Sequence, residues 1–245
     1  MKRIIIMALG VLLALALATP MALAQVGQGA TASGTAAELA AAWWQWATSN
    51  PVDSNPLIGP NDDHPVYSEE QCDGTPVSPT QGKTWFLAGT GDGSKVVRTC
   101  TMPVGTHLFF PVVNIVGFPF PENPLETKES ERAAAIARMD AVLGARDFFS
   151  LVTVDGKMVK SNRIGRATYS LGTGPYFTLT LPKDNVFGEP AGEYEATADG
   201  LWVTLPPLPP GVHTIHFEAS APSVGVSQNN TYILTVVNKG KKPAP

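Results

Sequence analysis

The chain has 245 residues, of which 44% are hydrophobic, so it can bury a core and is not intrinsically disordered. Its 17 Lys and Arg residues against 21 Asp and Glu residues leave no excess of positive charge to neutralise a phosphate backbone, so nucleic acid is not an expected partner. With 23 Gly and 22 Pro residues, the chain is expected to turn often.

The first 24 residues have the features of an export signal. Basic residues 2–3 precede an apolar run at residues 4–18, and small residues at 22–24 supply a cleavage site for signal peptidase. The apolar run of 15 residues is shorter than the roughly 20 that cross a bilayer, and Pro20 follows it, which argues against a retained anchor. We therefore expect residues 1–24 to be removed and the protein to be secreted or periplasmic, with no membrane span after cleavage.

Two cysteines, Cys72 and Cys100, are the only ones in the chain. In an exported protein such a pair is most simply interpreted as one disulfide, which here would close a loop of 29 residues. A metal site would need Cys or His ligands at close spacing, and neither cysteine has them. On the chain-entropy model, closing such a loop stabilises the folded state by about 3 to 4 kcal/mol.

The mature chain is expected to form a single β-rich domain over residues 35–237. A flexible lead-in at residues 25–34 precedes it, and a polar tail at residues 238–245 follows it. Thr35 and Glu38 have the spacing of a capping box, which predicts a helix from residue 35 to about residue 50.

The helix carries the tryptophan-rich segment WWQW. Leu39, Trp43 and Trp46 form one apolar stripe, which predicts that the helix packs on a sheet. Trp44 lies off this stripe, so it and Trp202 are the rings expected to be exposed and able to stack on a sugar.

Strand patterns dominate the rest of the chain. Asp155 with Gly156, and Asp199 with Gly200, each predict the turn of a β-hairpin, because both residue types tolerate positive φ. A second helix is expected from residue 127 to residue 143. The predicted strands are 85–88, 96–102, 107–116, 149–154, 157–160, 176–181, 193–198, 201–205, 213–219 and 231–237. Since strands and helices do not alternate, we expect a mainly β fold with two accessory helices: an antiparallel β-sandwich, of which the immunoglobulin-like type is one form, or a jelly roll.

Several sequence runs carry a resemblance to known proteins. They are WWQWA at 43–47, NP at 55–56, WFLAG at 85–89, CTMPVGTHLFFPVVN at 100–114 and LPPGVHTIHF at 208–217. With these runs the chain resembles a group of uncharacterised exported bacterial proteins over most of its mature length. The last run also looks like the late strand of immunoglobulin-like bacterial surface domains. The resemblance implies export and a β-rich fold, and it assigns no catalytic residue.

One loop gathers residues that could bind a metal. The sequence has no nucleophile elbow, phosphate-binding loop, HExxH helix or EF-hand loop. Asp62, Asp63 and His64 form the densest group of hard ligands, with Asp53 upstream, and could hold Ca²⁺ or a transition metal. Asp is also common in loops because it caps turns, so no cofactor is predicted.

Two further pairs are placed by strand alternation. His216 and Glu218 would share one face of a strand if Ile215 and its neighbour at 217 point inward, so their side chains could meet. Glu193 and Glu195 alternate onto one face in the same way.

We therefore expect an exported, non-enzymatic β-sandwich that binds a protein or a glycan outside the cytoplasm. The alternative is a hydrolase of an extracellular polymer, with an acidic pair drawn from Asp62, Asp63, Glu193 and Glu195.

The disulfide gives the first testable prediction. Intact-mass measurement of the unfolded, exported protein should show a gain of two hydrogen masses when Cys72 and Cys100 are reduced. An unchanged mass after reduction would show that the two thiols are not joined.

Overall fold

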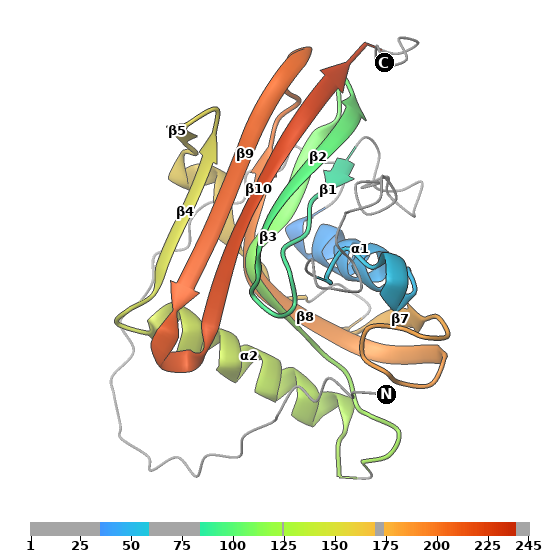
Figure 1. Cartoon of the computed structure of the whole chain (residues 1–245). Helices are drawn as coiled ribbons and strands as arrows, with labels where there is room; N and C mark the ends of the chain where they lie inside the picture. The colour runs from blue at the N-terminus through green and yellow to red at the C-terminus, as the bar shows by residue number, and fades with distance from the viewer. Residues whose placement is uncertain (1–34, 59–83, 124, 170–173, 239–245) are drawn as a thin grey trace.

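The computed structural model describes residues 35–58, 84–123, 125–169 and 174–238 (Figure 1). The predicted export signal and lead-in, the cluster Asp62, Asp63 and His64, and Cys72 lie outside these residues. Cys100 is buried in the core, and there is no free cysteine within the described part of the chain. With Cys72 not described, the bond between the two stays a prediction.

The described residues form two sheets, which confirms the mainly β prediction. Sheet one has the order β1 (Thr84–Phe86), β3 (His107–Gly117), β8 (Gly192–Leu205) and β6 (Ile164–Arg166), and β7 (Phe177–Leu181) also pairs with β8. Sheet two has the order β2 (Lys95–Pro103), β10 (Val226–Val237), β9 (Gly211–Ala221), β4 (Phe149–Val154) and β5 (Lys157–Met158).

The sandwich is not strictly antiparallel. β1 pairs with β3 in parallel, and β2 pairs with β10 in parallel, whereas the other pairs run antiparallel. Between β1 and β3 the chain crosses to sheet two and forms β2, so these two neighbours are not joined by a hairpin. Both sheets are therefore mixed.

The main core lies between the two sheets. Strand alternation directs Leu108, Phe110 and Val203 of sheet one toward Phe217 and Leu234 of sheet two. The rings of Phe110 and Phe217 lie 4.8 Å apart. The odd-numbered residues of β9 from Ile215 to Ala221 are thus buried, and the even-numbered ones point to the outside.

A second core lies between helix α1 (Ala36–Thr48) and the other face of sheet one. The predicted capping box is confirmed: Glu38 N donates to Thr35 Oγ1 at 3.2 Å, and Thr35 N donates to Glu38 Oε2 at 2.6 Å. The helix packs on β8, β7 and β3, as Figure 1 shows. Sheet one is therefore covered on both faces.

Both rings expected to be exposed are buried, so those two predictions are wrong. Trp44 is 7% exposed because α1 is covered on more than one side, by β8 and by β7. Trp202 is 2% exposed and stacks on Phe109, with ring centroids 5.0 Å apart and planes at 10°. It lies on the face of sheet one that α1 covers, so neither ring offers a stacking surface.

Helix α2 (Lys128–Gly144) has nearly the predicted bounds and packs on β8 and β3. Its buried residues Met139 and Val142 belong to the core between the sheets. A Cβ on Gly117 of β3 would lie 2.7 Å from the carbonyl oxygen of Glu131, so the glycine permits this close approach. No helix in the described ranges is long and apolar enough to cross a membrane.

Of the two predicted Asp-Gly turns, one is confirmed and one is wrong. Asp155 and Gly156 have φ values of 51° and 73° and connect β4 to β5. Asp199 and Gly200 instead lie inside β8, which runs without a turn from Gly192 to Leu205. Gly200 is needed there for close packing rather than for positive φ: a Cβ would lie 2.8 Å from both Asn114 Cβ and Val113 O, beside the bulge at Pro111–Val113.

The close approach at Gly200 predicts the effect of a methyl group at that position. Gly200→Ala should lower the free energy of unfolding by about 1 to 3 kcal/mol, because backbone atoms of β3 must move. Gly165→Ala in β6 is the matched control, since its Cβ would meet nothing within 4 Å. Urea unfolding of both variants tests this, and equal stabilities would contradict it.

Candidate functional site

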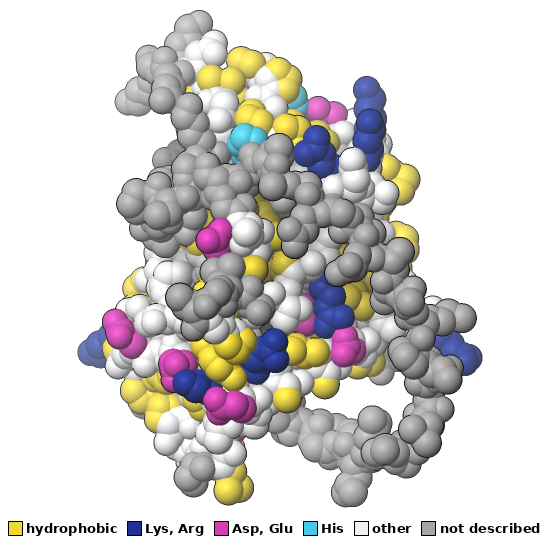
Figure 2. All heavy atoms as spheres, turned by 180° about the vertical axis from the view of Figure 1, so that it is seen from behind, with side chains coloured by type: hydrophobic (Ala, Val, Ile, Leu, Met, Phe, Trp, Pro, Cys, Tyr) yellow, Lys and Arg dark blue, Asp and Glu magenta, His cyan; other side chains and the backbone are white. Residues whose placement is uncertain are grey.

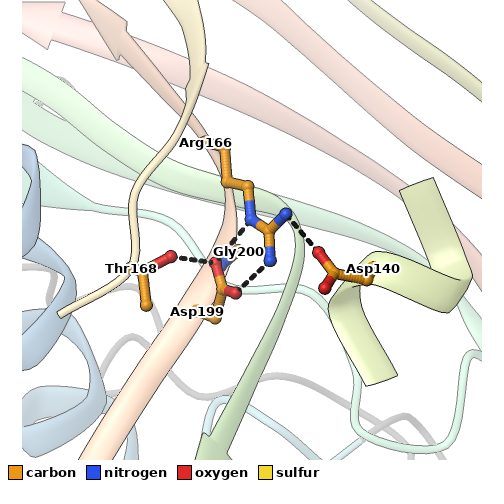
Figure 3. A network of polar contacts seen from close by, with 5 residues as sticks. All are labelled: Asp140, Arg166, Thr168, Asp199 and Gly200. Atoms are coloured by element: carbon orange, nitrogen blue, oxygen red, sulfur yellow. Dashed lines mark hydrogen bonds and ion pairs between the residues drawn. The ribbon is translucent and has the colours of Figure 1, made fainter. Parts of the chain in front are cut away.

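The most deeply buried charge lies in the middle of β8. Asp199 is fully buried, and its Oδ1 accepts hydrogen bonds from Arg166 Nε (3.1 Å), Thr168 Oγ1 (3.0 Å) and the Gly200 N–H (2.8 Å) (Figure 3). Its Oδ2 accepts from Arg166 Nη2 at 2.5 Å, and Asp140 of α2 accepts from Arg166 Nη1 at 2.6 Å. The network joins β6, β8 and α2.

These contacts make the network structural. Both oxygens of the Asp199 carboxylate accept hydrogen bonds from residues of the fold, and the side chain is fully buried, so a substrate in solvent does not reach it. The same carboxylate, chiefly through its hydrogen bonds, raises the pKa of Arg166, which keeps the guanidinium charged. Sequence patterns did not reveal this pair, because Asp199 was placed in a turn and Arg166 lies 33 residues away along the chain.

A buried cation, Arg98 of β2, also has a structural role. Its Nη1 donates to Ala88 O and to the Tyr232 hydroxyl, and its Nη2 donates to Pro56 O, each at 2.5 Å. Its guanidinium lies 5.4 Å from the centroid of the Tyr232 ring. Arg98 thereby ties the segment after α1 to both sheets.

The residues expected to form an acidic pair or a metal site do not converge in the described structure. Glu193 and Glu195 are both exposed on β8, and Lys128 Nζ lies 2.8 Å from both carboxylate oxygens of Glu195. Asp53 is exposed in a short 3-10 turn (Val52–Ser54), and its expected partners at 62–64 are not described. Within the described ranges, no group of three or more His, Cys, Asp or Glu residues could hold a metal ion.

The pairing of His216 with Glu218 is confirmed. Ile215 and Phe217 point into the core, and His216 Nε2 lies 3.5 Å from Glu218 Oε2 on the opposite face of β9. His216 Nδ1 lies 3.1 Å from Thr231 Oγ1, and Asn229 Nδ2 donates to Glu218 Oε2 at 3.0 Å. Both side chains belong to the surface that sheet two turns away from the core.

This outer face of sheet two is made by alternate residues of β2, β10, β9 and β4. Most of them are threonine or aliphatic, and the full charges are those of Lys95 and Glu218. The outer face consists of Lys95, Val97, Thr99, Thr101, Phe149, Leu151, Thr153, Val212, Thr214, His216, Glu218, Asn229, Thr231, Ile233 and Thr235, with Met158 of β5 beside Thr153.

Apolar side chains on the outer face are unusually exposed for a sheet. Val97 is 54% and Val212 is 67% exposed, and Phe149 and Met158 are exposed as well. On the side of the molecule seen in Figure 2, acidic and basic side chains lie among hydrophobic ones over the described residues. These apolar side chains lie on separate strands of one weakly charged face, where a partner could cover them together.

A hydrogen-bonded histidine lies at one end of sheet two. His213 Nδ1 lies 2.8 Å from Asp155 Oδ2, and its Nε2 lies 2.9 Å from Pro209 O, so the doubly protonated ring can donate to both. The hydrogen bond to Asp155 raises the pKa of His213, and the same bond, with one from the Thr214 N–H, lowers the pKa of Asp155. The pair holds the β4–β5 turn against β9.

Comparison with known proteins gives no family. No family model and no curated protein matches the chain. The similar solved structures include the solution structure of Amebosin (11% identity, 62% of this chain, 96% of that chain, TM-score 0.22). They also include a family 123 glycoside hydrolase from Clostridium perfringens (13% identity, 58% of this chain, 23% of that chain, TM-score 0.23). A third is PbICP-C in complex with falcipain-2 (13% identity, 64% of this chain, 100% of that chain, TM-score 0.21). Likenesses this distant carry no argument about function.

The ion pair between buried Asp199 and partly exposed Arg166 predicts a stability effect at Asp199. Asp199→Asn should cost about 1 to 3 kcal/mol of unfolding free energy, because Arg166 and Thr168 then donate to a neutral amide in place of a buried carboxylate. Asp140→Asn removes the exposed carboxylate that binds the same guanidinium and should cost at most about 0.5 kcal/mol. Denaturant unfolding measures both, and equal losses would show that burial of Asp199 is unimportant.

The histidine at Asp155 predicts a pH dependence of stability. With a raised pKa, His213 stabilises the fold below its ordinary pKa and loses this effect as the pH rises through the raised value. With a lowered pKa, Asp155 stabilises above its ordinary pKa and loses the effect as the pH falls through the lowered value. The pair therefore acts most strongly between about pH 4 and about pH 6.5.

Thermal unfolding across this range provides the test. The difference in Tm between the parent protein and His213→Gln should be larger at pH 5 than at pH 9. Asp155→Asn should give the same pH dependence, because it removes the other half of the pair. A difference that does not change from pH 5 to pH 9 would contradict the assignment.

Proposed function

We propose that the protein is an exported, non-enzymatic β-sandwich that binds another protein through the outer face of sheet two. The observation that supports this is the exposure of Val97, Val212, Phe149 and Met158 on one sheet face. The solvated face of a sheet is normally polar, so a face that keeps these side chains in water is suited to be covered by a partner. Export is proposed on residues 1–24 alone.

A protein is favoured over a glycan as the partner. Stacking on a sugar needs an exposed aromatic face, and the two rings expected to supply it, Trp44 and Trp202, are buried. The outer face offers mainly the methyl groups and hydroxyls of threonine and aliphatic side chains, with a single exposed phenyl ring, Phe149, on β4. Such a surface packs well against another protein surface.

Binding is also favoured over the hydrolase alternative. Glu195 forms an ion pair with Lys128. The buried Asp199 carboxylate accepts hydrogen bonds from Arg166, Thr168 and Gly200. A glycosidase needs two carboxylates that face each other across a substrate groove. Glu193 and Glu195 lie two residues apart on one strand rather than across a groove, and Asp62 and Asp63 are not described.

Site-specific photo-crosslinking in the exporting cell tests this proposal. A photoreactive residue is placed at Val97 or at Val212, and, as a matched control, at Leu125, which is 87% exposed and lies outside the outer face. After irradiation of the cells, we expect a discrete adduct from both outer-face positions and none from Leu125. No adduct, or equal adducts from all three positions, would contradict the proposal.

A further inference from the structure

We infer that the protein bound by the outer face of sheet two is a second copy of this chain, an inference that rests on the proposed function. The outer face carries one full charge of each sign, Lys95 and Glu218, among mostly neutral side chains. A strongly acidic or strongly basic partner would gain little from such a surface. A second copy brings the same two charges in the reverse arrangement.

The strand register shows how the charges would meet. Lys95 of β2 is paired with Asn229 of β10, and Asn229 is paired with Glu218 of β9. The two charges therefore lie in one row, on opposite sides of β10. A two-fold axis along β10, in the plane between two copies, exchanges the positions of β2 and β9. Each Lys95 then lies opposite Glu218 of the other copy, and the contact forms twice.

The other rows of β2, β10 and β9 are also compatible with this symmetry, whereas β4 and β5 lie outside the contact. Val97 comes opposite His216 and Thr99 opposite Thr214 of the second copy, and Ile233 lies at the axis. No like charges meet in these rows. Two sheets that pack face to face bury alternating small and β-branched side chains in the same way.

The size of the outer face is sufficient for a weak, specific dimer. Three neighbouring strands are about 15 Å wide and a strand of this length is about 35 Å long, which gives a footprint of about 500 Å² in each copy. The total of about 1,000 Å² is the lower limit for specific association. We therefore expect a dissociation constant in the micromolar range.

Charge reversal provides a test that a folding defect cannot imitate. Lys95→Glu and Glu218→Lys each place like charges opposite each other in the dimer, so each variant alone should be monomeric. An equimolar mixture of the two variants restores both contacts and should form a dimer. The charge reversal Glu129→Lys, in α2 and away from the outer face, is the control and should leave the parent dimer unchanged.

The measurement is sedimentation velocity of the purified protein at low ionic strength, over about 1 to 200 μM. A dimer in the parent, monomers in the two single variants and a dimer in their mixture would support the inference. A parent that stays monomeric throughout, or a mixture that stays monomeric while the parent dimerises, would overturn it.

Photo-crosslinking then separates this inference from the proposed function. An adduct at Val97 with twice the mass of the chain agrees with both. An adduct of another mass, with a monomeric parent, overturns the second-copy inference and leaves protein binding in place. The absence of any adduct, with a monomeric parent, contradicts both.

Discussion

The ion pair between Asp199 and Arg166 stabilises the middle of β8, the continuous strand that joins the other elements of sheet one. β8 pairs with β3, β6 and β7, and it is also the strand on which both helices pack. A buried carboxylate in such a strand is costly unless it accepts hydrogen bonds, and Arg166, Thr168 and the Gly200 N–H donate to it. The missing side chain at Gly200 lets β3 approach at the same point.

The outer face of sheet two depends on this arrangement indirectly. Sheet two rests its inner side chains, such as Phe217 and Leu234, on the inner face of sheet one, to which β8 contributes Val203 and Leu205. On its other face, sheet one is supported by α1. The layers thus hold β2, β10 and β9 side by side and keep their outward side chains in register. The proposed interaction surface is the outer face of sheet two, the layer that lies farthest from α1.

Local patterns in the sequence predicted the helices and strands. Features that depend on contacts between residues far apart in the sequence could not be predicted from such patterns. The capping box at Thr35 and the turn at Asp155 depend on neighbouring residues, so they were predicted correctly. The same Asp-Gly dipeptide at 199–200 was misjudged because its conformation is set by Arg166 and by β3. In the candidate site, the pairing of His216 with Glu218 was predicted from alternation within one strand. The outer face of sheet two could not be predicted in this way, because its residues are brought together by the register of four strands. The parallel pairing of β2 with β10 has no local signal.

The most direct test of the role given to this ion pair is a double-mutant cycle on Asp199 and Arg166. Unfolding free energies are measured for the parent protein, Asp199→Asn, Arg166→Gln and the double variant. If the ion pair stabilises β8 in the core, the effects of the two substitutions on the unfolding free energy are strongly coupled, with an interaction energy of about 1.5 kcal/mol or more. Additive losses, within about 0.5 kcal/mol, would contradict the central role of the pair.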